Sequence, residues 1–269
     1  MQGRYDELID LLNKALELKP NYPEAHNNLG IAFKKQGNLT AAIASYNTAL
    51  QLKPNYPDAY NNLGIALLEL GDLTAAIASY KTALQLEPNL TEAHNNLGIA
   101  LLEQGDLTAA IASYKNILQL KPNNPEVHNN LGNALKEQGD LTAAIASYNI
   151  ALKLKPNFAD AHNNLGNVFK EQGDLTAAIV SYNTALKLKP NYPEAHWNAS
   201  LTLLLGGDYE NGWGEYEWRA KRKKTKTQPH ALPKCDQWSS ELALNERNKL
   251  LLVTEQGLGD TLQFMRYAN

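Results

Sequence analysis

The sequence predicts an all-α fold in which helix-turn-helix units repeat along the chain and stack into a solenoid. The decapeptide GDLTAAIASY occurs at 71–80, 105–114 and 139–148, which makes the repeating unit 34 residues long. Within each unit, apolar residues recur three and four positions apart, as on the buried face of an amphipathic helix. One helical hairpin cannot bury such a face alone, whereas stacked neighbours can, and this favours a solenoid.

Six full units and one half unit account for most of the chain. The half unit covers residues 3–22, and the full units cover residues 23–220, with the last of them degenerate. We number the positions of a unit from 1 to 34 and place Pro23 at position 1. The first residues of the six full units are Pro23, Pro57, Thr91, Pro125, Ala159 and Pro193.

Each full unit is predicted to contain two helices, at about positions 2–14 and 16–30. Pro at position 1 suits the first turn of a helix, where its missing N–H needs no partner. Gly at position 15 ends the first helix, and the Asn or Asp that follows caps the second. Pro at position 32 stops the second helix. Gly64 at position 8 and Ala76 at position 20 are small, so we expect the two helices to approach closely there.

Several residues of the first full unit recur, unchanged or with a similar residue, at the same positions along the chain: Leu29, Gly30, Phe33, Ala42, Tyr46, Ala49 and Pro54. This pattern resembles the tetratricopeptide repeat family over residues 3–220. The resemblance implies a right-handed superhelix whose first helices line a concave groove, and it implies protein or peptide binding. We interpret the sixth unit as a terminal unit adapted to a different neighbour. It departs from the pattern at Ser200, Gly212, Arg219 and Lys224.

The groove implied by the resemblance is expected to present a column of asparagines. Position 6 is Asn in every full unit: Asn28, Asn62, Asn96, Asn130, Asn164 and Asn198. A side-chain amide offers two donors and one acceptor group, which matches the donor and the acceptor of a peptide backbone. We therefore predict that this column holds an extended peptide with little regard for its side chains. It resembles the asparagine ladder of the eukaryotic O-linked N-acetylglucosamine transferases.

Other groove positions are expected to change character along the chain. Units two and three offer an apolar patch at positions 9 and 12, formed by Ile65, Leu68, Ile99 and Leu102. Units four and five offer a polar, basic stretch at the same positions, formed by Asn133, Lys136, Asn167 and Lys170. This predicts a partner with an apolar anchor followed by polar residues. Position 5, which is Asn in five units and Trp197 in the sixth, is a weaker candidate.

Two alternatives compete with these binding roles. In the first alternative the asparagines stabilise the turn or pair with one another along the stack, and in the second the near-identical units inherit them by duplication. A histidine at position 4 recurs as His26, His94, His128, His162 and His196. Consecutive units lie far apart compared with metal–ligand bonds of about 2 Å, so we assign these rings to packing or to the groove wall. We predict no metal site and no cofactor.

The overall composition suggests a soluble, cytoplasmic protein. The chain has 269 residues and a formal net charge of −3, which gives no general reason to expect nucleic acid or an anionic membrane. No stretch approaches the roughly 20 apolar residues of a membrane span. The N-terminus lacks the apolar run and cleavage site of a signal peptide. The single cysteine, Cys235, fits a reducing compartment.

The composition changes abruptly after residue 220. Five of the six residues in KRKKTK, at 221–226, are basic. Such a run can contact nucleic acid, but no aromatic residues interleave its basic ones, so we expect no nucleic-acid partner and assign residues 221–240 to a solvated linker. The apolar run Leu250–Val253 predicts a buried parallel strand. The glycine turn that follows it, and the helix that begins at Asp260, complete a strand–turn–helix unit of the kind that opens many nucleotide-binding folds.

This C-terminal stretch, LLLVTEQGLGDTLQFMRYA, resembles bacterial proteins in which tetratricopeptide repeats precede a glycosyltransferase domain similar to the heptosyltransferases. The resemblance implies that residues 241–269 begin a Rossmann-like domain and that Asp260 is catalytic in an intact parent enzyme. The rest of that domain has no counterpart because the sequence stops at Asn269, so we expect the chain to be a fragment or a truncated gene product. One strand cannot make a sheet, and its exposed edge would favour self-association.

Two functions follow from the sequence. The first is a protein–protein interaction scaffold that binds extended peptide segments in its groove. The second is the substrate-presenting region of a glycosyltransferase whose catalytic domain is truncated. Whether the parent protein is an enzyme is uncertain, and we expect no transferase activity from this chain alone.

Overall fold

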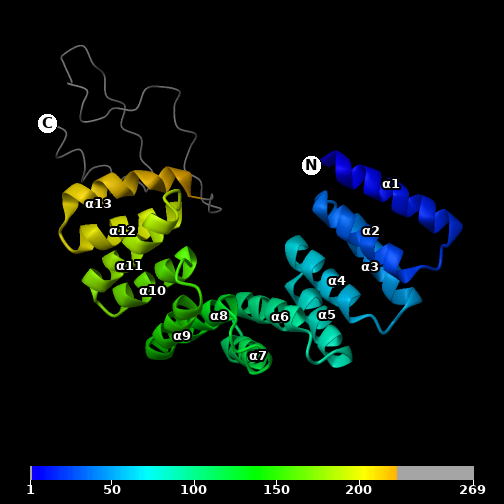
Figure 1. The fold of residues 1–269 in the computed structure, drawn as a ribbon, viewed down its shortest axis with the longest axis horizontal. Helices are drawn as coiled ribbons and strands as arrows, with labels where there is room; N and C mark the ends of the chain where they lie inside the picture. The colour runs from blue at the N-terminus through cyan, green and yellow to red at the C-terminus, as the bar shows by residue number, and fades with distance from the viewer. Residues whose placement is uncertain (1, 223–269) are drawn as a thin grey trace, which may run out of the picture. The chain divides into compact units, whose positions relative to one another are not determined.

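The computed structural model describes residues 2–222, and every element in that range is helical (Figure 1). The chain divides into a unit of residues Met1–Arg219 and a second unit of residues Ala220–Asn269. The described elements are thirteen α-helices and one short 3-10 helix: α1 Gln2–Leu18, α2 Pro23–Lys35, α3 Leu39–Leu52, α4 Pro57–Leu70, α5 Leu73–Leu86, α6 Thr91–Gln104, α7 Leu107–Leu120, α8 Pro125–Glu137, α9 Leu141–Leu154, α10 Ala159–Glu171, α11 Leu175–Leu188, α12 Pro193–Leu205, α13 Tyr209–Tyr216 and η1 Glu217–Lys221.

Several predictions fall outside the described residues. These are most of the linker at 221–240, the strand, glycine turn and helix at 241–269, Asp260, and self-association through the C-terminal segment. They stay predictions. The all-α solenoid of helical hairpins is confirmed within residues 2–222.

The second full unit shows how closely the turn residues set the helix bounds. Its helices α4 and α5 begin and end within one position of the prediction. Gly71 between them adopts a left-handed conformation with φ of 93°, which glycine tolerates at a helix end. The Asp72 side chain then accepts a hydrogen bond of 3.0 Å from the Ala75 N–H and so caps α5. The second helices of the other five full units are capped in the same way.

Successive hairpins stack so that their first helices lie on the inner side of the unit Met1–Arg219. From α2 to α12, Cα atoms of successive first helices approach within 8 Å of each other, whereas within residues 2–222 those of successive second helices do not. First helices are therefore closer together, as elements on the inner side of a curved stack must be. Figure 1 shows α5, α7 and α9 outside α4, α6 and α8. We call the surface formed by α2, α4, α6, α8, α10 and α12 the inner face.

A glycine on the first helix packs beneath a tyrosine ring on the second helix in each of the first five full repeats. A Cβ atom added to Gly64 would lie 2.5 Å from Cε1 of Tyr80, and the equivalent distances elsewhere are 2.5 to 2.7 Å. The close approach predicted at this position is thus confirmed. The five tyrosine side chains are fully buried: Tyr46, Tyr80, Tyr114, Tyr148 and Tyr182.

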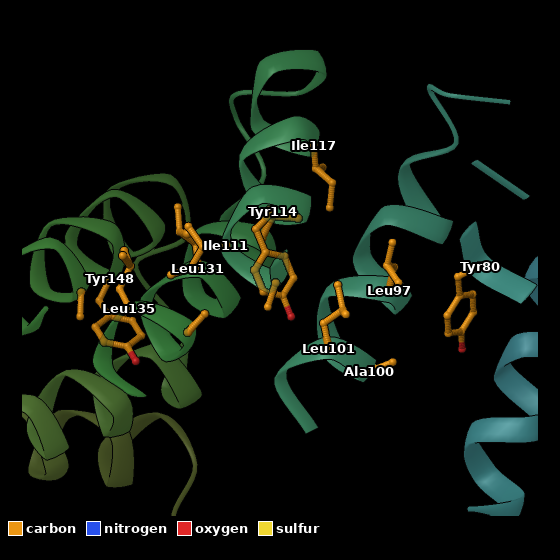
Figure 2. Packing of buried hydrophobic residues seen from close by; sticks show 14 of the residues in the cluster. Tyr80, Leu97, Ala100, Leu101, Ile111, Tyr114, Ile117, Leu131, Leu135 and Tyr148 are labelled. Atoms are coloured by element: carbon orange, nitrogen blue, oxygen red, sulfur yellow. The ribbon is translucent and has the colours of Figure 1, made fainter. Parts of the chain in front are cut away.

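These tyrosines belong to a core that runs through consecutive repeats. Figure 2 shows Tyr114 of α7 between leucines of α6 and α8, with Tyr80 and Tyr148 further along the stack. Each ring therefore contributes both to its own hairpin and to the contact with a neighbour. This nearest-neighbour core is the arrangement expected of a solenoid.

The sixth repeat differs at two positions where small residues lie between its helices. Position 8 is Ser200, fully buried, and its hydroxyl donates to the Trp197 carbonyl at 2.9 Å. Position 20, which is alanine in the other full repeats, is Gly212 on α13, where an added Cβ would lie 2.7 Å from Cδ2 of Leu204. The glycine–tyrosine contact of the first five full repeats is therefore replaced in the sixth.

Replacing Gly64 with alanine tests the glycine–tyrosine contact. Ala usually stabilises an exposed helix interior by about 1 kcal/mol relative to Gly. Here we expect destabilisation by about 1–3 kcal/mol, because the methyl group would overpack the core against Tyr80. Urea unfolding followed by circular dichroism measures the effect. The control is Gly214→Ala in α13, where an added Cβ meets nothing within 4 Å. Equal stabilisation by both substitutions would contradict the contact.

Candidate binding face on the first helices

The asparagines at positions 5 and 6 form a hydrogen-bonded ladder between successive repeats. In every pair, Nδ2 of the position-6 Asn donates to Oδ1 of the position-5 Asn in the preceding repeat. The five bonds are Asn62 to Asn27 at 3.0 Å, Asn96 to Asn61 at 3.0 Å, Asn130 to Asn95 at 3.2 Å, Asn164 to Asn129 at 3.1 Å and Asn198 to Asn163 at 3.0 Å. Pairing along the stack, one of the two alternatives raised by the sequence, is therefore present.

The two rows of asparagines differ in burial, and this separates their roles. Asn27, Asn61, Asn129 and Asn163 are only 4–7 % exposed, so position 5 serves mainly to hold the stack together. The position-6 residues from Asn62 to Asn198 are partly exposed, and Asn28 is exposed. Each bond to the preceding repeat uses one of the two N–H donors of the position-6 amide. The second N–H and the Oδ1 atom keep hydrogen-bonding capacity.

The sixth repeat differs from the others at position 5, which is Trp197 in place of the asparagine acceptor. Its ring lies 5.0 Å from the Tyr216 ring, and Tyr216 in turn meets the edge of Trp213 at 5.3 Å. An aromatic cluster thus stands where an amide acceptor would otherwise be.

The predicted apolar patch on α4 and α6 is half-buried. Ile65, Leu68 and Leu102 pack partly against the core cluster, and Ile99 is 38 % exposed. Ile99 is therefore the part of the patch that offers most surface to a partner.

The polar side chains of units four and five already make bonds within the chain that the sequence did not indicate. The Tyr148 hydroxyl donates to Oδ1 of Asn133 at 2.7 Å, and the Tyr182 hydroxyl donates to Oδ1 of Asn167 at 2.8 Å. Lys136 pairs with Glu171 across the repeat boundary at 3.6 Å. Asn133 and Asn167 thus have a packing role in addition to any contact with a partner, which the residue pattern alone did not indicate.

In the first two full repeats, where position 9 is isoleucine, the hydroxyl of the same tyrosine lacks a partner. The hydroxyls of Tyr46 and Tyr80 are buried and make no hydrogen bond, because Ile31 and Ile65 replace the asparagine acceptor. Burial raises the pKa of both phenols well above its usual value, and the nearby Glu69 carboxylate adds to the shift.

The position-4 histidines close the turn between repeats. The Nε2–H of His26 donates to the carbonyl of Pro20 at 3.0 Å, and the other four rings make the same bond to the proline six residues earlier. This agrees with a packing role. His196 differs, because its Nδ1 also bonds the Glu215 carboxylate and its ring stacks on Trp218 at 3.8 Å. Within residues 2–222 no cluster of three or more metal-ligating side chains occurs.

Comparison with known protein families identifies the repeat. A family model described as the TPR repeat matches six overlapping segments: residues 1–37, 32–71, 66–105, 100–139, 132–173 and 166–206. The chain belongs to the TPR repeat family. A comparison with curated proteins gave no match.

Solved structures share the TPR fold at low sequence identity. YrrB, described as a TPR protein with an unusual peptide-binding site, is 21 % identical with a TM-score of 0.58, over 68 % of this chain and 95 % of its own. MamA is 25 % identical with a TM-score of 0.56, over 60 % of this chain and 95 % of its own. The pilF protein of Pseudomonas aeruginosa is 19 % identical with a TM-score of 0.63, over 74 % of this chain and 97 % of its own.

The function class that the TPR repeats support is a protein-interaction scaffold. The inner face consists of helices, and its asparagine side chains are held by hydrogen bonds between repeats. None of the helices in residues 2–222 combines the length and the apolar character needed to cross a membrane.

The two kinds of tyrosine in this TPR array allow a matched stability test. Tyr148→Phe removes a hydrogen bond to Asn133, and we expect destabilisation by about 1 kcal/mol. Tyr80→Phe removes a buried hydroxyl that has no partner, so stability should stay the same or rise. Urea unfolding of both variants gives the comparison. The hydrogen-bonding scheme would be wrong if Tyr80→Phe cost as much stability as Tyr148→Phe.

Proposed function

We propose that the inner face binds an extended polypeptide segment and that the position-6 asparagines hold its backbone. The observation that carries the proposal is the ladder, because it repeats one partly exposed amide at each repeat boundary. An N–H donor is left on each of these amides, and Oδ1 is left as an acceptor except at Asn164, where it already accepts from Asn163 at 3.5 Å and has one lone pair remaining. This matches the N–H and C=O of one residue in an extended chain.

The bond to the preceding repeat favours such binding by fixing each amide in advance. A side chain that is already immobilised loses less conformational entropy when a ligand binds. The pairing between repeats and the binding of a partner are therefore compatible, and the first supports the second. Position 5 contributes as the anchor of this arrangement.

Backbone hydrogen bonds alone give weak affinity. Each nets about 1 kcal/mol, while ordering each residue of the bound segment costs about 1–2 kcal/mol. We therefore assign affinity mainly to the apolar patch, with Ile99 as its exposed member. Burial of apolar area contributes about 25 cal/mol per Å². The ladder then fixes which residue of the bound segment lies at each repeat. The polar stretch near Lys170 contacts the side chains that follow the apolar anchor.

Selection from a library tests the proposal. A random dodecapeptide phage library is selected on the wild-type protein, and the dissociation constants of enriched peptides are measured by fluorescence anisotropy. The triple variant Asn96→Ala, Asn130→Ala, Asn164→Ala should bind these peptides at least tenfold more weakly, because three bonds of about 1 kcal/mol each are lost. Unchanged affinity would exclude the ladder as the binding surface.

Two control variants separate direct contact from loss of structure. The first replaces three exposed asparagines on the second helices, Asn47, Asn149 and Asn183, and should bind normally. The second replaces the position-5 acceptors Asn61, Asn95 and Asn129, which removes the same bonds between repeats but leaves the position-6 amides in place. We expect the second control to lose less affinity than the position-6 variant. Equal losses would mean that the asparagines act only through the stack.

A second candidate function is presentation of an acceptor polypeptide to a glycosyltransferase domain. The similarity of Gly259-Asp260 and its surroundings to heptosyltransferases is the observation that favours it. The gene sequence after Asn269 tests it: two complete Rossmann-like halves would support this role, and an in-frame stop codon would leave the scaffold alone. In either case we expect the present 269-residue chain to transfer no sugar.

A further inference from the structure

A row of charge pairs crosses the repeat boundaries at the end of the first helices. Lys34 at position 12 of the first repeat pairs with Glu69 at position 13 of the second, at 3.4 Å. Lys136 and Glu171 make the same pair between the fourth and fifth repeats, at 3.6 Å. Where position 12 is lysine and the next position 13 is glutamate, the two side chains therefore meet across the boundary.

The lysine–glutamate pair does not form at the boundary between the fifth and sixth repeats. Position 12 of the fifth repeat is Lys170, but position 13 of the sixth is Leu205, which is 69 % exposed. Lys170 is partly buried on α10 and makes no ion pair within residues 2–222. A lysine on the inner face without the carboxylate that Lys34 and Lys136 have favours an anionic group from outside the chain.

The neighbouring charges limit which anion fits. Glu103 and Glu137 occupy position 13 opposite Leu68 and Leu102, so neither carboxylate has a lysine across its boundary. A polyanion such as nucleic acid would pass these acidic groups as it followed the inner face and would be repelled. A polypeptide with a single acidic side chain avoids this repulsion.

We propose that Lys170 determines specificity for the bound segment by pairing with one of its Asp or Glu side chains. This inference rests on the proposed peptide-binding function and adds the class of residue that the segment must carry. The acidic residue lies toward the sixth repeat, and the apolar anchor lies over the second and third.

The spacing between the anchor and the acidic residue suits a short segment. Ile99 in the third repeat and Lys170 in the fifth are two repeat intervals apart. Adjacent first helices pack about 10 Å apart, so the two side chains are separated by about 20 Å along the face. An extended chain covers about 3.3 Å per residue, which places the acidic side chain about six residues from the residue that contacts Ile99. A dodecapeptide is therefore long enough to reach both.

The first test compares the peptides selected by four forms of the protein. A random dodecapeptide phage library is selected separately on the wild type, Lys170→Gln, Leu205→Glu and Lys34→Gln. Leu205→Glu supplies the missing carboxylate inside the protein, as Glu171 does for Lys136. Lys34→Gln is the matched control, since that lysine already has a partner. Circular dichroism establishes that each variant is folded.

We expect Asp or Glu to be enriched at one position of the peptides selected by the wild type and by Lys34→Gln. The enrichment should disappear with Lys170→Gln and with Leu205→Glu. Its survival in both of these variants would overturn the inference. If ladder-dependent peptides show no acidic preference at all, this inference fails and the proposed function stands. If no selected peptide depends on the position-6 asparagines, the proposed function fails and this inference fails with it.

The second test measures the pairing itself. One selected peptide and its Glu→Gln form are titrated against wild type and Lys170→Gln, which gives a double-mutant cycle. We expect each single change to weaken binding about three- to fivefold, with no further loss when both are made, and a smaller effect at high salt. Independent, multiplying losses would contradict direct pairing. A single-stranded oligonucleotide that binds the wild type and loses affinity with Lys170→Gln would also overturn it, in favour of a polyanion.

Discussion

The contact between a glycine on the first helix and a tyrosine on the second is the constraint on which the rest of the structure depends. In the first five full repeats it brings the two helices of the hairpin so close that a methyl group does not fit between them. The buried ring then joins a core shared with the neighbouring repeats. Because these five hairpins share the same contact, their first helices repeat at a regular interval, and side chains at one position form a row along the inner face.

Regular spacing makes the asparagine ladder possible. A hydrogen bond of about 3 Å can recur at five boundaries only if each repeat is placed on the last in nearly the same way. The ladder stabilises the stack and also orients one partly exposed amide at each boundary. The lysine–glutamate pairs belong to the same regularity, and their interruption at Leu205 is what makes Lys170 different from its equivalents. The uniform repeats form the inner face. We expect specificity for a bound segment to arise at positions where one repeat differs from the others.

The sequence predicts the parts of this structure that depend on local chemistry. Pro57, Gly71 and Asp72 set the bounds of their helices, and Gly64 marks the close approach. Contacts between repeats are harder to foresee, because they depend on how far one hairpin is displaced from the next. The sequence therefore indicated that the asparagines face the groove or one another, but it did not show that Asn62 reaches Asn27. Likewise, the bond from Tyr148 to Asn133 depends on side-chain orientation as well as on spacing.

Nuclear magnetic resonance of the asparagine side chains tests the central claim most directly. The protein is labelled with ¹⁵N on asparagine, the carboxamide signals are assigned with single variants, and a selected dodecapeptide is added. The account predicts shifts at Asn96, Asn130 and Asn164, with Overhauser effects to the peptide backbone amides, and no shift at the outer residues Asn47, Asn149 and Asn183. Saturable binding that shifts only the outer asparagines, or none of the six, would contradict it.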